Sequence, residues 1–392
     1  MTREAGYSIV ELLIAMGIVL SVVGSTLLLL NAVQRAAPRE AERADLQQRL
    51  RVASDALHHD LAMAGAGGSR GSQSRSLDFF VASVLPFRQG GSNADPAGTF
   101  KPDTITLLYV PRLTSAASTI RESTFAQSAS VRVNLGGSCP PGDPVCGFGV
   151  GADVMIFDDR ASYDTFRIVG VQADVLQLQH TMIDSPLVYQ AGANIVEIVS
   201  HTYSLQTDAA TGSPRLMRDD GAADVPLVDH VVGLAFEYYG ESSPPVLVRP
   251  VTERIGPWTT YGPKPPPLDV QSTLYPPGEN CVFRLDPNTG EQIPRLAVLG
   301  GGTTGTLARL TEQQLTDGPW CPDESSANHF DADLLRVRRI TAVLRVEAAL
   351  TALRGPAGVL FARGGTAADA RSQVPDREVR FDVTPRNLNF GR

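Results

Sequence analysis

An unbroken apolar segment near the N-terminus constrains this chain more than any other feature of its sequence. Residues 9–30 read IVELLIAMGIVLSVVGSTLLLL and contain a single charged residue, Glu11. A helix of about 22 residues is about 33 Å long, which matches the hydrocarbon thickness of a bilayer. No comparable run follows in the sequence. The segment therefore predicts one membrane-spanning helix or an N-terminal membrane anchor.

Glu11 lies two residues inside this apolar run. A carboxylate at membrane depth costs on the order of 2–3 kcal/mol, so its presence there predicts a functional role. The alternative is that Glu11 lies shallow enough to reach water, in which case it needs no partner. The sequence pattern by itself leaves both interpretations open.

The composition of the whole chain excludes several classes of protein. The 392 residues include 43% hydrophobic and 19% charged residues, and this balance is not that of a wholly disordered chain. The net charge of −8 provides no general basic field for nucleic acid, so we expect no nucleic-acid partner by bulk charge. A mean hydropathy near zero excludes several membrane spans. The length predicts one large domain or two ordinary domains.

Residues 35–64 have the pattern of an amphipathic helix. Leucine and alanine recur at spacings of three and four at positions 46, 50, 53, 57, 61 and 64. Charges of both signs occupy the other positions, and we expect them to form a solvated face. Pro38 is expected to break or kink the helix or to begin a new one, and Gly65 is expected to end it.

Beyond Gly68 the sequence changes to short β-type runs separated by Gly, Pro, Asp and Ser. This order predicts an α+β fold, in which one long N-terminal helix packs on an antiparallel β-sheet head. Residues 241–330 are irregular and rich in Pro and Gly, so they predict an insertion. The expected strands are 103–110, 130–134, 153–157, 166–171, 175–180, 194–203, 227–239, 336–348, 359–362 and 378–384.

The four cysteines, Cys139, Cys146, Cys281 and Cys321, suit disulfides in an exported head. Three connectivities are possible, and local pairing of Cys139 with Cys146 and of Cys281 with Cys321 is the simplest. Zinc is the competing interpretation, but these spacings match no usual set of zinc ligands.

Motifs that suggest catalysis or ligand binding occur in unfavourable contexts. The G-x-S-x-G of residues 67–71 follows a helix instead of a strand, and the G-x-G-x-x-G of residues 300–305 lacks the second strand with its acidic residue. Asp286 and Asn288 resemble part of a calcium loop, but the bidentate glutamate is missing and an Asx turn is the alternative. We therefore expect neither an enzyme nor a resident cofactor.

The N-terminal sequence resembles a known type of processing signal. Residues 6–12 read GYSIVEL, which is similar to the type III signal of type IV prepilins and of type II secretion pseudopilins. The resemblance implies that a prepilin peptidase cleaves after Gly6 and that Tyr7 becomes the N-methylated first residue. It also implies that Glu11, as the fifth residue, pairs with the N-terminal amine of a neighbouring subunit. Such a pair would make a buried carboxylate tolerable.

Looser matches over the rest of the chain resemble the W-type minor pilins, which are similar to the J-type minor pseudopilins. The resemblance implies a pilin fold that divides into a leader (1–6), a membrane and filament-core helix (7–34), an amphipathic half-helix (35–64) and a periplasmic or extracellular head (65–392). The segments that carry it are 103–107, 152–156, 231–239 and 386–387.

The implied role is a minor pilin that primes or caps a type IV pilus. Its implied partners are other minor pilins, the major pilin, the prepilin peptidase that also methylates the new N-terminus, the inner-membrane assembly platform and, before assembly, membrane lipid. The implied location is the inner membrane, with a single span and a periplasmic head, and then the filament. A pseudopilin of a type II secretion system is one alternative. A tip adhesin or DNA-uptake pilin that uses residues 241–330 is the other.

Overall fold

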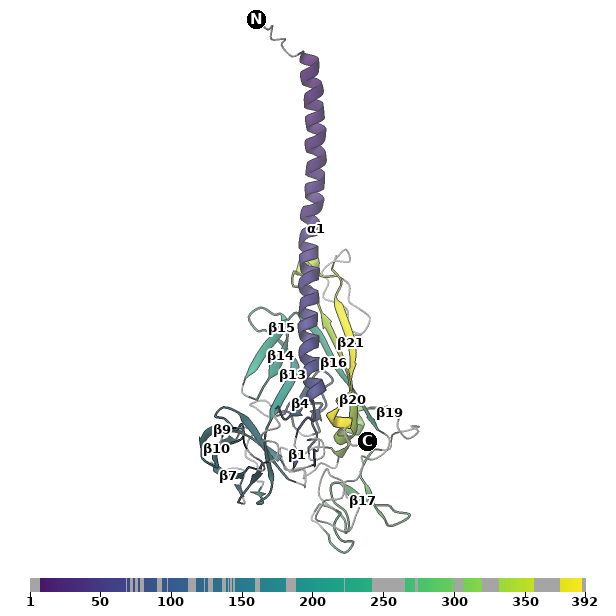
Figure 1. Ribbon diagram of the computed structural model, residues 1–392. Coiled ribbons are helices and arrows are strands. Elements are labelled where there is room, and N and C mark those ends of the chain that lie inside the picture. The colour runs from purple at the N-terminus through teal and green to yellow at the C-terminus, as the bar shows by residue number, and fades with distance from the viewer. Residues whose placement is uncertain are drawn as a thin grey trace. The chain divides into compact units, whose positions relative to one another are not determined.

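The computed structural model joins one long N-terminal helix to antiparallel β-sheets, so the α+β class is confirmed (Figure 1). The chain forms two compact units, residues 1–51 with 346–378 and residues 52–345 with 379–392. The structure describes residues 8–389 except 68, 71–72, 75–76, 78–80, 90–93, 97, 112–117, 123, 126–129, 136–138, 140, 142, 144, 159–162, 181–187, 222, 242–264, 272–273, 298, 300–305, 319–330 and 356–373.

Helix α1 runs from Ile9 to Met63 and continues through Pro38. A proline removes one backbone donor from a helix but does not necessarily end it. The helix ends where the chain turns at Gly65, whose φ of 73° is accessible to glycine at little cost. There the Gly65 amide donates to the carbonyl of Leu108 (3.0 Å) instead of extending the helix. The predicted end is therefore confirmed to within two residues.

The predicted apolar stripe of α1 is confirmed by burial. Five of its six members, at positions 46, 53, 57, 61 and 64, have no exposed surface, and the sixth, at 50, is half-buried. The prediction that all the charged residues form a solvated face was wrong for several of them. Glu42 is 7% exposed and Asp60 is 2% exposed. Both face polar partners that lie far away in the sequence.

Glu42 belongs to a polar cluster within the smaller unit. Its Oε1 accepts a hydrogen bond from the backbone amide of Ala349. Arg49 of α1 pairs with Asp45 and donates to the carbonyl of Glu347 (3.3 Å). Residues 347–349 thus contact α1, and the carboxylate of Glu42, which was expected to be solvated, holds them there.

The larger unit contains a five-stranded antiparallel sheet in the order β15-β14-β13-β4-β3. One expected strand, 103–110, corresponds to β4. The expected strand 194–203 is in fact two strands, because the chain leaves one sheet and enters another at Ile198. The strands are β3 (Val84–Leu85), β4 (Ile105–Tyr109), β13 (Val199–Thr207), β14 (Pro214–Asp219) and β15 (Asp224–Asp229).

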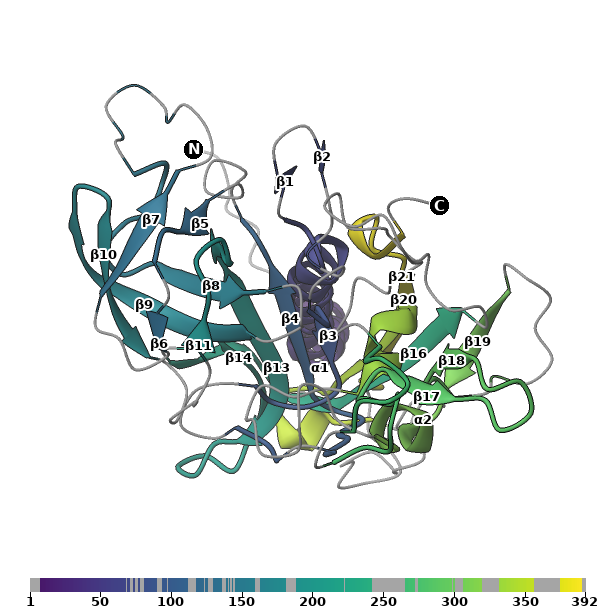
Figure 2. The ribbon, with the colours of Figure 1, turned by 90° about the horizontal axis from the view of Figure 1, so that it is seen from below.

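A closed six-stranded antiparallel barrel lies between β4 and β13 in the sequence, and its strands follow the order β10-β7-β5-β12-β8-β9 (Figure 2). Alternate residues of β7 and β10 are buried and fill the interior. The expected head had one sheet, so this closure is an unpredicted feature. The strands are β5 (Thr119–Ile120), β7 (Ser130–Asn134), β8 (Asp153–Phe157), β9 (Tyr163–Gln172), β10 (Val175–His180) and β12 (Asn194–Glu197).

The chain enters and leaves the barrel at neighbouring points of the five-stranded sheet. Tyr109, the last residue of β4, is the register partner of Val199, the first residue of β13. Within the barrel, Thr119 and Asn194 of the first and last strands also pair. The barrel is therefore inserted where a short hairpin turn would otherwise connect two adjacent strands.

The third large sheet has four strands in the order β19-β16-β20-β21. The expected strand 227–239 divides at His230, which has a φ of 61°, so that β15 and β16 join different sheets. Strand β19 lies inside the expected insertion 241–330 yet pairs with β16, so the irregular segment is shorter than expected. The strands are β16 (Val231–Glu241), β19 (Leu307–Leu310), β20 (Val337–Val346) and β21 (Arg377–Val383).

The remaining elements are short. The hairpin of β17 (Phe283–Leu285) and β18 (Gln292–Pro294) lies within the irregular segment, and β6 (Thr124–Phe125) pairs with β11 (Val188–Tyr189). The others are β1 (Ser69–Arg70), β2 (Gln73–Ser74), α2 (Glu312–Thr316) and the 3-10 turns η3 (Ala332–Arg336), η4 (Thr351–Leu353) and η5 (Asn387–Asn389). The expected strand 359–362 lies outside the described residues.

Candidate functional site

The first turn of α1 holds the predicted assembly residue, Glu11. Its Oε2 accepts a hydrogen bond from the backbone amide of Ser8 (3.1 Å), while the Ser8 hydroxyl accepts from the amide of Val10 (3.2 Å). This reciprocal arrangement is a variant of the capping box, and it satisfies donors that the start of a helix leaves unpaired. The side chain of Glu11 remains exposed. It can therefore cap its own helix or accept a cation from outside.

The helix behind Glu11 presents apolar side chains on all sides. None of the side chains in the apolar window within Ile9–Leu30 is buried, and this is the one described helix with the length and apolarity to cross a membrane. Ile9, Leu20 and Leu28 are between 66% and 79% exposed. Soluble proteins rarely expose so large an apolar surface, so the segment requires lipid or a protein partner.

Small and hydroxyl residues interrupt this surface without leaving a polar group unpaired. The Ser21 hydroxyl donates to the carbonyl of Gly17 (3.0 Å), and the Thr26 hydroxyl donates to that of Val22 (3.0 Å). The Ser25 hydroxyl likewise turns back to the carbonyl of Ser21. Gly17, Ser21 and Ser25 are four residues apart and so share one face, where another helix backbone can approach closely. The spacing is also visible in the sequence, as a glycine and two serines that recur every four residues.

Asp60 fixes the last turns of α1 to the five-stranded sheet. Its Oδ2 lies 2.5 Å from Nδ1 of His201 and accepts from the hydroxyl of Tyr203 (2.6 Å), while Oδ1 accepts from the hydroxyl of Tyr109 (3.1 Å). Burial alone would raise the pKa of Asp60, but the hydrogen bonds from His201 and Tyr203 outweigh it and hold the pKa below its ordinary value. This carboxylate positions the helix against β4 and β13.

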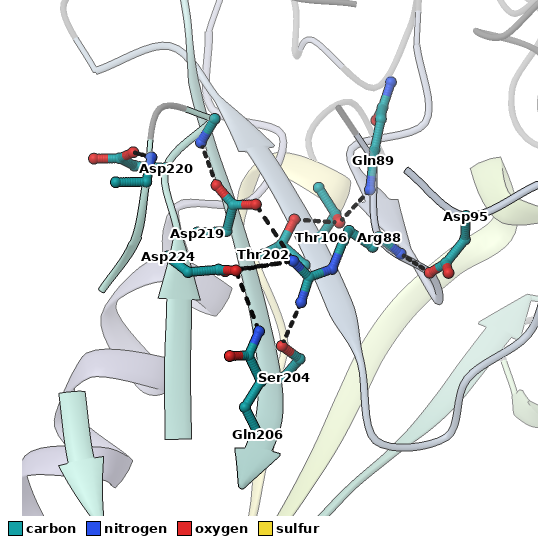
Figure 3. A network of polar contacts seen from close by, with 12 residues as sticks. Arg88, Gln89, Asp95, Thr106, Thr202, Ser204, Gln206, Asp219, Asp220 and Asp224 are labelled. Atoms are coloured by element: carbon teal, nitrogen blue, oxygen red, sulfur yellow. Dashed lines mark hydrogen bonds and ion pairs between the residues drawn. The ribbon is translucent and has the colours of Figure 1, made fainter. Parts of the chain in front are cut away.

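A second polar network centres on Arg88, which is 8% exposed (Figure 3). Its guanidinium donates to the hydroxyl of Ser204 (2.8 Å) and lies 3.4 Å from Asp224 and 3.6 Å from Asp219. The backbone amide of Arg88 donates to Asp95 (2.7 Å). The network joins the loop after β3 to three strands of the sheet, and its donors and acceptors are used internally.

Three carboxylates, Asp317, Asp331 and Asp333, place one oxygen each within 4.8 Å of one another. Burial raises the pKa of both Asp331 and Asp333. The two oxygens of Asp331 accept from the amides of Asp333 (2.8 Å) and Gly318 (2.7 Å). Asp333 accepts from Arg336 (2.6 Å) and from the amide of Ala297 (2.9 Å). These bonds engage both oxygens of Asp331 and both oxygens of Asp333 within the fold, so the two carboxylates stabilise the turn before β20.

The calcium candidates Asp286 and Asn288 lie in the turn between β17 and β18. Asp286 Oδ1 accepts from the amides of Asn288 (2.8 Å) and Thr289 (3.4 Å), which is the geometry of an Asx turn. The amide of Gly290 donates to the Asp286 carbonyl (2.8 Å). The local sequence is therefore accounted for by turn formation.

The disulfide predicted between Cys139 and Cys146 is present, with Cα atoms 4.6 Å apart in the loop between β7 and β8. Cys281 is also disulfide-bonded. Cys321 lies outside the described residues, as do Gly6 and Tyr7 at the expected processing site. The G-x-G-x-x-G of residues 300–305 lies there too, while residues 307–310 beyond it form a strand.

Comparisons with models of known protein families, with curated proteins and with solved structures yielded no match. Among the described residues, the exposed carboxylate of Glu11 lies in the first turn of a helix whose apolar surface is uncovered.

Proposed function

We propose that the chain is a minor pilin, a subunit that primes the assembly of a type IV pilus or caps it as part of a tip complex. One observation carries the proposal: an uncovered apolar helix starts with the exposed carboxylate of Glu11, five residues after a glycine in a polar leader. The continuity of α1 into a β-rich head supports a pilin fold.

In this proposal the apolar half of α1 occupies two environments in turn. It first spans the inner membrane, with the head in the periplasm, and later packs among the helices of the filament. Both environments accept an apolar surface, and the hydroxyls of Ser21 and Thr26 suit both because they bond within the helix. The face of Gly17, Ser21 and Ser25 would allow close helix contacts in the filament.

Glu11 would guide docking onto the N-terminal amine of a neighbouring subunit. The Ser8 amide occupies Oε2 at 3.1 Å, and the exposed position of the side chain leaves room for a second donor. A cation at this carboxylate would compensate its transfer into an apolar filament core. The partners would be the major pilin, the other minor pilins and the assembly platform.

The processing step can be tested by intact mass spectrometry of the full chain in a host that has a prepilin peptidase. We expect the wild-type chain to lose residues 1–6 and to gain one methyl group on Tyr7. Gly6→Val should retain the leader. Gly17→Val is the matched control, because a side chain at Gly17 meets no atom within 4 Å, and it should be processed normally. Equal processing of both variants would refute the assigned cleavage site.

The assembly step can be tested with Glu11→Gln, which removes the charge but keeps an oxygen that can accept from Ser8. We expect normal processing but loss of the subunit from sheared filaments and loss of piliation or secretion. Glu4→Gln removes a carboxylate from the leader and serves as the control. Normal incorporation of Glu11→Gln would contradict a role for the charge.

Two alternatives lead to different outcomes. A pseudopilin of a type II secretion system would show the same processing, but Glu11→Gln would abolish protein secretion and leave surface pili intact. A tip adhesin or DNA-uptake pilin would lose binding but keep filaments after removal of residues 244–294. This deletion spares Ala297 and β19, which belong to the folded unit. The exposed side chains of Leu268 and Leu274 within the removed segment favour such a surface role.

A further inference from the structure

One face of the four-stranded sheet carries arginines on three of its strands. Arg309 of β19 is the register partner of Tyr239 on β16, and the guanidinium of Arg339 on β20 stacks over the Tyr239 ring at 4.1 Å. Arg380 of β21 approaches Glu237, also on β16, at 2.7 Å. Neighbouring strands lie about 4.8 Å apart, so this arginine row spans about 14 Å.

The arginine row (Arg309, Arg339 and Arg380) has fewer acidic partners than guanidinium groups. Glu237 is shared, because its two oxygens lie 3.4 Å from Arg309 and 2.7 Å from Arg380, and it also accepts from the Tyr239 hydroxyl (2.9 Å). Two further carboxylates lie on β21, those of Glu378 and Asp382, each two residues from Arg380. That of Asp382 accepts from the hydroxyl of Thr341 (2.5 Å).

Arg339 has no carboxylate partner among the described residues, and its buried Nε has no hydrogen-bond partner there. Stacking on Tyr239 fixes the plane of the guanidinium but satisfies none of its donors. A half-buried guanidinium in this state favours an incoming carboxylate, which can accept two parallel hydrogen bonds. The flanking side chains of Arg309 and Arg380 are 65% and 46% exposed, so an external group can reach the row.

Two features of the arginine row indicate which kind of anionic ligand it suits. They are the distance that the row spans and the stacking of Arg339 on the Tyr239 ring. A single small oxyanion fills one guanidinium fork, whereas three arginines across about 14 Å suit several carboxylates on one surface. Binding of single-stranded nucleic acid relies on aromatic faces on which bases stack. Arg339 already occupies the face of Tyr239, so these observations favour an acidic protein surface.

We propose that the arginine row of the β19-β16-β20-β21 sheet is a docking surface for an acidic segment of a partner protein, with Arg339 receiving a carboxylate. This inference rests on the proposed function in one respect: the partner is then another subunit of the same assembly. The interaction strengthens at low salt because its charges lie at a solvent-exposed surface.

The test uses the full chain in detergent micelles and a fluorescent octaglutamate peptide, with fluorescence anisotropy as the readout. We expect saturable binding that weakens when the salt is raised from about 20 mM to about 0.3 M. Arg339→Gln should weaken binding about tenfold, and Arg309→Gln should weaken it measurably. Arg284→Gln, at an exposed position of β17, changes the net charge equally and should bind like the wild type. Circular dichroism checks that each variant is folded.

Three outcomes would overturn the inference. They are absence of saturable binding, equal weakening by Arg284→Gln, and tighter Arg339-dependent binding of a heparin oligosaccharide or an oligothymidylate than of the peptide. Weaker peptide binding by Arg339→Gln alone does not distinguish a lost contact from local unfolding. Arg309→Gln, which changes a mostly exposed side chain, must therefore weaken binding as well. Peptide binding requires neither processing nor filaments, so its failure is distinguishable from failure of the pilin assignment.

Discussion

Two buried tyrosines provide a test in which one chemical change should have opposite effects. Tyr203 and Tyr238 are 0% and 1% exposed. The Tyr203 hydroxyl donates to Asp60 at 2.6 Å, whereas the Tyr238 hydroxyl has no hydrogen-bond partner among the described residues. Replacement by phenylalanine removes one oxygen at each site and leaves the ring in place. The difference between the two variants therefore reports on the hydroxyl alone.

The magnitudes follow from what each hydroxyl contacts. A hydrogen bond to a charged group contributes about 1.5–3 kcal/mol, so Tyr203→Phe should lower the free energy of unfolding by that amount. An unsatisfied buried polar group costs about 1–3 kcal/mol, so Tyr238→Phe should raise the free energy of unfolding by about 1 kcal/mol or more. Tyr109→Phe should fall between them, because its hydroxyl reaches Asp60 over a longer 3.1 Å.

The assay is equilibrium unfolding in urea of the full chain in micelles, followed by far-ultraviolet circular dichroism. The three variants should rank as Tyr238→Phe, Tyr109→Phe and Tyr203→Phe in order of decreasing midpoint, with an unchanged slope. Two results would contradict these expectations: a Tyr203→Phe variant as stable as the wild type, or a Tyr238→Phe variant less stable than the wild type. The second result would mean that the Tyr238 hydroxyl has a partner, for example an ordered water.

Three further predictions concern the polar clusters and the barrel. Because the pKa of Asp60 lies below its ordinary 3.8 in the folded state, its ionisation stabilises the fold above about pH 4 and that contribution is lost as the pH falls through the folded pKa. Urea midpoints across this range should therefore decline more steeply for the wild type than for Asp60→Asn, and parallel curves would contradict this. Glu42→Ala should destabilise the smaller unit by about 1–3 kcal/mol by leaving the Ala349 amide without its acceptor, as faster hydrogen exchange at 347–349 would show, whereas exposed Glu40→Ala should have little effect. Replacement of residues 111–197 by a two-residue turn should leave β4 and β13 paired, and a loss of amide protection in 199–207 would refute the modular arrangement.

The sequence allowed some elements to be predicted to the residue. The short β-type runs 130–134, 153–157 and 175–180 predicted the bounds of β7, β8 and β10, because such a run and the turn residues beside it are local features of the sequence. The stripe of α1 was predicted from another local feature, the recurrence of apolar residues at spacings of three and four. Division of the strands at Ile198 and His230 could not be read in this way. At Ile198 the chain changes its partner strand, and at His230 the positive φ carries no sequence signal comparable to glycine.

Features that depend on distant partners were not predictable from local pattern. Closure of the barrel depends on the pairing of β5 with β12, residues far apart in the sequence. Glu42 and Asp60 look like solvated charges until Ala349 and Tyr203 are brought against them. At the candidate site, Glu11 was found from its unusual place in an apolar run, but its bond to Ser8 depends on the helix geometry.

The insertion of the barrel also bears on the order in which the head can fold. Pairing of β4 with β13 would close a loop of about ninety residues if the intervening chain were unfolded, whereas a folded barrel brings Thr119 next to Asn194 and leaves about a dozen residues to close. The entropic saving is about 2 kcal/mol, enough to make a non-local strand pair behave kinetically like a local hairpin. A barrel that folds first would thus bring together β4 and β13 of the sheet that contacts α1. A destabilising substitution in the barrel core should therefore slow folding of the head without changing a contact of α1.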